Sequence, residues 1–421
     1  MLDYFKIASR NLRRNKVRTL ISILAITVVV MIVVFSRGLI VGFTQSFSDH
    51  LIDNTAGHVR VVNEDYRLRE VLMSLDYPID GFQGRGLENM LTEKETIEEI
   101  DYMLPRLRFG ALYTVGGDLE AIAGVGVNPE REEVHGTLPG DLVEGRMPEI
   151  GEEIVLGKGL LNDMQAAVGD RVTLMFSDAY HSFRGRTFEV VGVRESGFSM
   201  IDDNMFYLPL DTAQNILGLE DQATEILVFG NSRGQADVIE EKVTTLFTDQ
   251  NEIDRYAVLH WLHADSSMIA FLEEMDIIFD FVYIGFVILG AVIVASTLIM
   301  IIRERKSEIG MMAALGLKGR DIMKIFTLEG AFMGIVGSLL GTVGGGVINY
   351  HLSQQGIHVQ ALGDAARGMD LLFEPVFYPV YDFGNLIFSF VLGVIIVILA
   401  CLYPAYQAAK MEPVEALDVE E

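Results

Sequence analysis

The chain has 421 residues, of which 50% are apolar and 22% are charged, and its formal net charge is −27 at pH 7. Its mean hydropathy of +0.32 is too high for an ordinary soluble enzyme, and its charged share is too high for a channel buried throughout in the membrane. The composition predicts membrane spans joined to a large soluble domain. The acidic balance argues against nucleic-acid binding.

Four windows of predominantly apolar residues predict four transmembrane helices, at residues 19–43, 277–302, 325–350 and 383–403. Each window can cross a bilayer core about 30 Å thick. The first is too long for the h-region of a cleaved signal peptide. Lys and Arg are concentrated in residues 1–18 and in the loop 303–324, which predicts that both segments and both chain termini are cytoplasmic.

Residues 1–18 predict an amphipathic helix on the cytoplasmic membrane surface. Leu2, Phe5, Ala8 and Leu12 lie on one side of this helix, and basic residues surround the rest. Beyond the first span, Phe43, Phe47 and Leu51 recur every four residues, so the helix is expected to continue outside the cytoplasm as a stalk.

Residues 44–276 are expected to form one large α+β domain outside the cytoplasm. Of these, residues 44–275 carry 17 Lys or Arg against 43 Asp or Glu, which is nearly all of the net negative charge. Gly- and Pro-containing stretches near residues 136–140 and 218–222 bracket an inserted subdomain at about 135–224. Strands are predicted at 57–62, 120–125, 171–176, 187–193 and 225–229, and helices at 94–103, 159–167, 210–217 and 235–248.

The third span contains two faces of small residues. Gly330 and Gly334 are four residues apart, and Gly337, Gly341 and Gly345 repeat that spacing, which lets neighbouring helices approach closely. A helix-dimer face and a packing face within the chain remain equally open. A second external loop, 351–382, contains an aromatic segment, 373–381, suited to the membrane interface. After the fourth span, residues 404–421 form a cytoplasmic tail.

Several nucleotide-binding, catalytic and metal-binding motifs are absent from the sequence. The phosphate-binding loop Gly-x-x-x-x-Gly-Lys-Ser/Thr is absent, as are His-Glu-x-x-His, Gly-x-Ser-x-Gly and Cys-x-x-Cys. His260 and His263 stand three apart, but no further ligand is near them in sequence, so solvated or interface histidines are favoured over a metal site. We therefore expect no catalytic residues, no metal and no cofactor in this chain.

Three segments of the chain carry motifs: the entry segment 8–20, the loop 303–326 and the end 403–417. They resemble motifs of the FtsX-like permease family of ABC transporters, the group that contains MacB, LolC and LolE, and segments 8–20 and 403–417 are similar to the family's first and last motifs. Segments 144–148, 153–157, 168–172 and 206–214 look like its Sabre-type subdomain, with Porter-type segments flanking it. The loop 303–326 is similar to the family's signature at Arg305, Glu308, Ile309, Gly310, Ala314 and Gly316.

The resemblance implies an α-helical membrane protein of the bacterial inner membrane, with four transmembrane helices and a large α+β periplasmic domain inserted between helices 1 and 2. It also implies that the loop 303–324 couples to an ATPase. In a short helix, 307–315, Glu308 is expected to bridge to basic groups on that ATPase, with Gly310 and Gly316 turning the backbone on either side. A simple topology signal would explain the Lys and Arg residues of this loop but not the run from Glu308 to Gly316.

Three functions remain open from the sequence: extraction of lipoprotein or another lipidated or amphiphilic cargo, MacB-type efflux of periplasmic substrates, and FtsX-type signalling to a periplasmic hydrolase. The turn 177–186 is short for the chaperone-binding hook of LolC. Expected partners are a separate MacB- or LolD-like ABC ATPase that binds ATP and Mg²⁺, a second copy or a sister permease, membrane lipids, and a periplasmic lipoprotein or chaperone. Nucleic acid is not an expected partner.

Overall fold

The computed structural model describes residues 10–12, 14, 16–67, 69–92, 97–263, 266–358 and 376–410. The chain divides into two compact units. Unit 1 comprises Met1–Ser46, Leu272–His358 and Val376–Glu421, and unit 2 comprises Phe47–Phe271 and Val359–Pro375.

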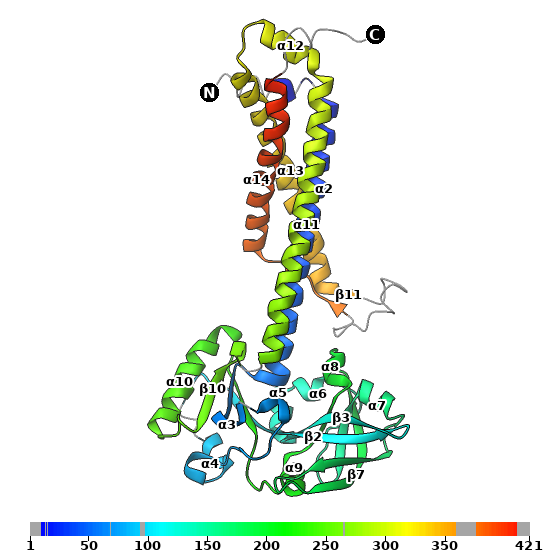
Figure 1. Ribbon diagram of the computed structural model, residues 1–421, viewed down its shortest axis with the longest axis vertical. Helices are drawn as coiled ribbons and strands as arrows, with labels where there is room; N and C mark the ends of the chain where they lie inside the picture. The colour runs from blue at the N-terminus through cyan, green and yellow to red at the C-terminus, as the bar shows by residue number, and fades with distance from the viewer. Residues whose placement is uncertain are drawn as a thin grey trace. The chain divides into compact units, whose positions relative to one another are not determined.

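Unit 1 is built from long apolar helices that lie side by side (Figure 1). They are α2 (Lys16–Leu51), α11 (Ser266–Glu304), α13 (Gly319–Gln355) and α14 (Phe383–Ala409), and the short helix α12 (Lys306–Ala314) joins α11 to α13. Among the described residues, four helices are long and apolar enough to cross a membrane, and they contain the four windows that the sequence predicts as spans. Their shared core consists of Ile26, Val30, Val34, Val294, Leu298, Met333, Val397 and Cys401.

The helices extend beyond the predicted apolar windows. Helix α2 continues to Leu51, as the spacing of Phe43, Phe47 and Leu51 predicted. Of the second external loop, 351–382, the structure describes the end of α13, a two-stranded pairing of β11 (Ile357–His358) with β12 (Val376–Phe377), and residues 378–382. Residues 359–375 of that loop, residues 1–9 of the predicted amphipathic helix and residues 411–421 of the tail lie outside the described residues.

Unit 2 is an α+β unit around a ten-stranded sheet in the order β10-β1-β9-β2-β3-β8-β5-β7-β4. Strand β6 pairs with both β2 and β7, so the six strands β2, β3, β8, β5, β7 and β6 close into a ring. The strands are β1 (Val59–Asn63), β2 (Tyr102–Val115), β3 (Asp118–Val127), β4 (Leu142–Gly145), β5 (Glu153–Gly157), β6 (Arg171–Ser177), β7 (Phe183–Arg194), β8 (Met205–Pro209), β9 (Glu225–Phe229) and β10 (Tyr256–His260).

Short helices lie between these strands. One is the π-helical turn η1 (Ile52–Ala56), which follows α2 directly. The α-helices are α3 (Glu64–Arg67), α4 (Leu87–Thr92), α5 (Pro129–His135), α6 (Thr137–Gly140), α7 (Lys158–Asp163), α8 (Ser199–Asp202), α9 (Leu210–Leu217) and α10 (Ala236–Asp249). The remaining single turns are η2 (Glu70–Leu72), η3 (Phe82–Gly84), η5 (Arg233–Gln235) and η6 (Trp261–His263).

Large aromatic side chains from several strands fill the ring. Phe109 contacts Phe176 and Phe206 in edge-to-face geometry, with ring centroids 5.9 and 5.8 Å apart. A Cβ at Gly124 would lie 2.4 Å from the Phe109 ring, so a residue without a side chain is needed where these rings meet. The buried aromatic core stabilises unit 2 without any disulfide, since the chain's single cysteine lies in α14.

All five strands predicted in this region are present as β1, β3, β6, β7 and β9. The predicted helices 210–217 and 235–248 correspond to α9 and α10. The helix predicted at 94–103 is wrong throughout its described part: residues 97–101 are not helical, and Tyr102 and Met103 begin β2 and pair with β9. Residues 93–96 lie outside the described part of the chain. The helix predicted at 159–167 is too long, because α7 ends at Asp163 and Gln165 has a φ of +53°.

Candidate functional site

Helix α12 packs one face against unit 1. Ile309 is fully buried in an apolar cluster with Ile302, Ile322 and Phe326. These side chains come from α11, α12 and α13, so the short helix packs against both long helices through buried apolar contacts. The predicted coupling helix, 307–315, corresponds closely to α12.

A buried ion pair lies at the start of α12. The Arg305 guanidinium, 4% exposed, donates to Glu329 Oε2 at 2.6 Å and to Glu308 Oε2 at 2.9 Å. Glu329 is also 4% exposed, and its carboxylate accepts a hydrogen bond from Asn11 Nδ2 at 2.8 Å. Removing either member of the Arg305–Glu329 pair would leave an uncompensated buried charge. Arg305 is therefore a positioning residue for α12.

The structure places Glu308 in an intramolecular network. Besides Arg305, it forms an ion pair with Arg14. Partial burial raises the pKa of the Glu308 carboxyl, but the hydrogen bonds and charges of Arg305 and Arg14 outweigh this effect, and the net pKa lies below its usual value. A bridge from Glu308 to an ATPase stays a prediction, and it would have to form beside these two arginines.

The two glycines of the signature play different parts. Gly316 has a φ of +95°, so it turns the backbone left-handed between α12 and α13, as expected. The expected turn at Gly310 is wrong: Gly310 is buried inside α12, and the helix begins before it, at Lys306. The turn on that side falls at Arg305, which ends the connection from α11.

The outer face of α12 exposes apolar side chains. Leu315 is 83% exposed and Met311 is 51% exposed, and Ala314 lies on the same exposed side. Exposed basic residues lie near this face in the sequence, namely Arg303, Lys306, Lys318, Arg320 and Lys324. We call Met311, Ala314 and Leu315 the α12 patch. Exposed apolar side chains on a helix whose other face is buried are suited to docking another protein.

The glycines of α13 face two neighbouring helices within the chain. A Cβ at Gly330 would lie 2.2 Å from Cys401 Sγ of α14. On the second face, a Cβ at Gly337 would lie 2.6 Å from Ile26, at Gly341 2.7 Å from the Thr27 carbonyl oxygen, and at Gly345 2.8 Å from Val34, all on α2. Helices α2 and α13 therefore approach closely through Gly337, Gly341 and Gly345.

Sequence reasoning missed Glu329 and Asn11. Glu329 had a usable signal, because a carboxylate inside an apolar membrane helix indicates a buried partner. Among the described residues, no group of three or more His, Cys, Asp or Glu side chains could hold a metal ion. His260 is buried, and its Nδ1 accepts from the Leu262 amide at 3.2 Å.

The chain matches two protein families. Residues 19–246 match the MacB-like periplasmic core domain, and residues 281–413 match the FtsX-like permease C-terminal region. A match over more than half of the chain to the first family, followed by the second, agrees with the motif resemblance. The match to the MacB-like periplasmic core domain covers residues 47–246 of the α+β unit 2.

Curated relatives of this chain include transmembrane and permease proteins. The lipoprotein-releasing system transmembrane protein LolC of Xylella fastidiosa is 24% identical over 70% of this chain and 72% of its own length. An uncharacterized ABC transporter permease of Methanocaldococcus jannaschii is 23% identical over 99% of this chain and 97% of its length. The macrolide export ATP-binding/permease protein MacB of Psychrobacter cryohalolentis is 21% identical over 99% of this chain but 59% of its own length. The chain belongs to the FtsX-like ABC transporter permease family and carries a MacB-like periplasmic core domain.

Proposed function

We propose that this chain is the permease subunit of an ABC transporter that extracts lipoprotein, or another lipidated or amphiphilic cargo, from the outer leaflet of the bacterial inner membrane. ATP is hydrolysed by a separate subunit, which binds ATP and Mg²⁺. In this proposal the chain crosses the membrane four times with both termini in the cytoplasm, and its α+β domain is inserted between the first two spans and lies in the periplasm.

The observation that carries the proposal is the α12 patch. Leu315 and Met311 are exposed on a helix whose opposite face is buried and whose start is held by the Arg305–Glu329 ion pair. A helix that is held between two membrane spans by buried contacts can transmit force, whereas an unpacked loop cannot. Docking of an ATPase on this patch explains why large apolar side chains are exposed in a loop otherwise rich in charge.

The further partners follow from the family. A second copy or a sister permease would complete the transporter, and lipidated cargo would enter between the two sets of spans. A periplasmic chaperone or lipoprotein would receive the cargo. The name of the LolC relative favours lipoprotein release.

A MacB-type transporter, which drives efflux of periplasmic substrates, is the second candidate, and it is favoured by a match to MacB that covers 99% of this chain. FtsX-type signalling to a periplasmic hydrolase is the third reading. Copurification separates the three, because release brings a lipidated protein, efflux an adaptor protein, and signalling a hydrolase.

The ATPase-docking step is tested by Leu315→Asp in the full-length chain, with Leu119→Asp as the matched control. Leu119 is 59% exposed in unit 2 and lies far from α12 in sequence. We expect Leu315→Asp to lower the amount of ATPase recovered with the permease at least tenfold, since about 1.4 kcal/mol corresponds to a factor of ten and burying a leucine stabilises by about 1.5–3 kcal/mol. Leu119→Asp should leave recovery unchanged. Equal recovery for the two variants would remove the α12 patch as the docking surface.

A further inference from the structure

The last residues of α2, from Phe47 on, belong to unit 2, and a π-helical turn follows them there. Helix α2 ends at Leu51, and η1 begins at Ile52 with no linker between them. Ile52, Asn54 and Ala56 of this turn are buried. Helix ends leave carbonyl groups without partners inside the helix, and π-helical turns occur frequently at functional sites.

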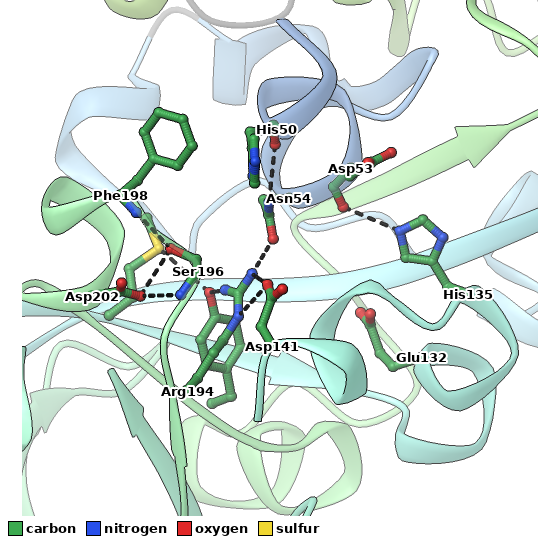
Figure 2. Close-up of polar contacts among 12 residues, drawn as sticks. His50, Asp53, Asn54, Glu132, His135, Asp141, Arg194, Ser196, Phe198 and Asp202 are labelled. Carbon is green, nitrogen blue, oxygen red and sulfur yellow. Dashed lines mark hydrogen bonds and ion pairs between the residues drawn. The ribbon is translucent and has the colours of Figure 1, made fainter. Parts of the chain in front are cut away.

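Two side chains of unit 2 bind these carbonyl groups. Arg106 of β2 donates to the Asn54 carbonyl oxygen, and its guanidinium also makes a bidentate pair with Glu132 of α5 at 2.9 and 3.2 Å. His135 of α5 lies with Nε2 3.2 Å from the Asp53 carbonyl oxygen (Figure 2). The backbone of η1 is thereby attached to β2 and to α5.

The Asn54 side chain makes a third attachment. Its Oδ1 accepts from Arg194 at the end of β7, and its Nδ2 donates to the His50 carbonyl oxygen at 3.1 Å (Figure 2). Arg194 is 1% exposed and donates to Asp141 Oδ2 at 2.7 Å and to the Tyr207 hydroxyl of β8. Asn54 thus connects the last turn of α2 to strands on the ring of the sheet.

Phe198 packs against aromatic side chains of the last turns of α2. Its ring lies 4.6 Å from the His50 ring and 5.5 Å from the Phe47 ring, measured between centroids. The segment before it is ordered by Asp202, whose Oδ1 accepts from the Ser196 amide at 3.0 Å and from the Ser196 hydroxyl at 2.8 Å. Contacts on the last turn of α2 and on η1 therefore come from β2, α5, β7 and residues 196–202.

We propose that Asn54, Arg106, His135 and Arg194, here called the η1 clamp, form a positioning device that makes the end of α2 and the sheet of unit 2 move as one body during each ATP cycle. The carbonyl groups at a helix end can be satisfied without a buried guanidinium. Buried ion pairs can also often be replaced by apolar side chains without loss of stability. Here two buried guanidiniums, from β2 and from β7, donate to one residue of this turn, Asn54. This inference rests on the proposed function, because ATP-driven movement of α2 is what the clamp would transmit.

The first test compares Asn54→Leu with Asn63→Leu in the reconstituted permease–ATPase complex. Asn63 is a matched control because the two residues are 8% and 9% exposed, both lie in unit 2, and the Asn63 side chain accepts locally from the Asp65 amide at 3.0 Å. We expect Asn54→Leu to lower cargo released per ATP hydrolysed at least fivefold, with the hydrolysis rate within twofold of wild type. Asn54→Asp, which keeps the acceptor for Arg194, should restore most of the release. Equal release per ATP for Asn54→Leu and Asn63→Leu would overturn the inference.

A second measurement does not depend on cargo. Spin labels are placed at the exposed residues Asp49 and Glu144 of the full chain after the buried Cys401 is changed to Ala. The clamp predicts one narrow distance distribution with and without ATP, unchanged in Asn63→Leu and broadened at least twofold in Asn54→Leu. A wild-type distance that changes between nucleotide states, or a narrow distribution in Asn54→Leu, would contradict the clamp. If the wild-type complex releases no cargo but these distances behave as predicted, the proposed cargo is wrong and the clamp stands.

Discussion

At the scale of single residues, each of the two units contains buried arginines that pair with carboxylates. Arg305 pairs with Glu329 in unit 1, and Arg106 and Arg194 pair with Glu132 and Asp141 in unit 2. The bidentate fork of arginine suits such sites, because it can bind a carboxylate and still donate to a further group.

His135 gives unit 2 a pH dependence. Burial lowers the pKa of His135 below its usual value, and in the neutral tautomer with the proton on Nε2, Nδ1 accepts from the Tyr102 hydroxyl at 3.0 Å. Because the folded pKa lies below the unfolded value of about 6.5, the unfolded chain takes up a proton first as the pH falls. The stability of unit 2 should therefore decrease below about pH 6.5.

The measurement is denaturant unfolding of the full chain between about pH 7 and pH 5, followed by the fluorescence of Trp261, the chain's single tryptophan, which is buried in unit 2. His135→Gln keeps a donor and an acceptor but does not titrate, so its stability should fall less over this range than that of wild type. The carboxylates titrate in both proteins and cancel in the comparison. Parallel pH curves for the two proteins would show that His135 does not contribute.

Some of these residues could be found from the sequence, and others could not. Arg305 and Glu308 belong to a local motif, and Glu329 stands out as a charge in an apolar helix. Nothing in the sequence pairs Asn54 with Arg194, because 140 positions separate them and neither belongs to a motif. Only the ring of strands brings them together.

At the scale of elements, the sequence pattern predicted the regular helices and strands better than the irregular strand β2. The period of the apolar residues was sufficient to find the four long helices and five of the strands. Strand β2 escaped detection because Pro105, Arg106, Arg108 and Gly110 interrupt the alternation of apolar and polar residues, although β2 pairs with β3, β6 and β9. Pairing with distant strands outweighed the local pattern.

The packing of α13 on α2 predicts a severe effect for Gly341→Leu. A Cβ at this position would lie 2.7 Å from both the Thr27 carbonyl oxygen and Val30 Cβ, so the backbones must separate. Overpacking of this kind costs about 1–3 kcal/mol or more, and we expect a lower thermal midpoint and a lower yield of monodisperse protein.

Gly285→Leu is the matched control for this variant. Gly285 lies in α11, another apolar helix, and a Cβ there meets nothing within 4 Å inside the chain. Size-exclusion chromatography and thermal unfolding of both variants in the same detergent provide the comparison. Equal behaviour of Gly341→Leu and Gly285→Leu would show that the α2–α13 contact tolerates a side chain.

At the scale of the whole molecule, charge and hydropathy divide the chain into an apolar helical part and an acidic α+β part, and this division was predictable from composition. The sequence also predicted an inserted subdomain at about 135–224. In the structure, strands β4 to β8 of that segment share one continuous sheet with β1, β2, β3, β9 and β10. The closure of six strands into a ring could not be predicted, because it depends on the pairing of β6 with β2 across a long stretch of chain.

In the proposed function, ATP hydrolysed by a partner subunit drives extraction of lipidated cargo through this permease. The most direct measurement reconstitutes the chain with its copurifying ATPase in lipid vesicles that hold a lipidated protein, or the same protein without its lipid, and follows loss of the protein from the vesicles into solution. The chain alone should hydrolyse no ATP, since the phosphate-binding loop is absent from its sequence. We predict that the complex releases the lipidated protein only with hydrolysable ATP. Vigorous ATP hydrolysis with no release of the lipidated protein would contradict the account.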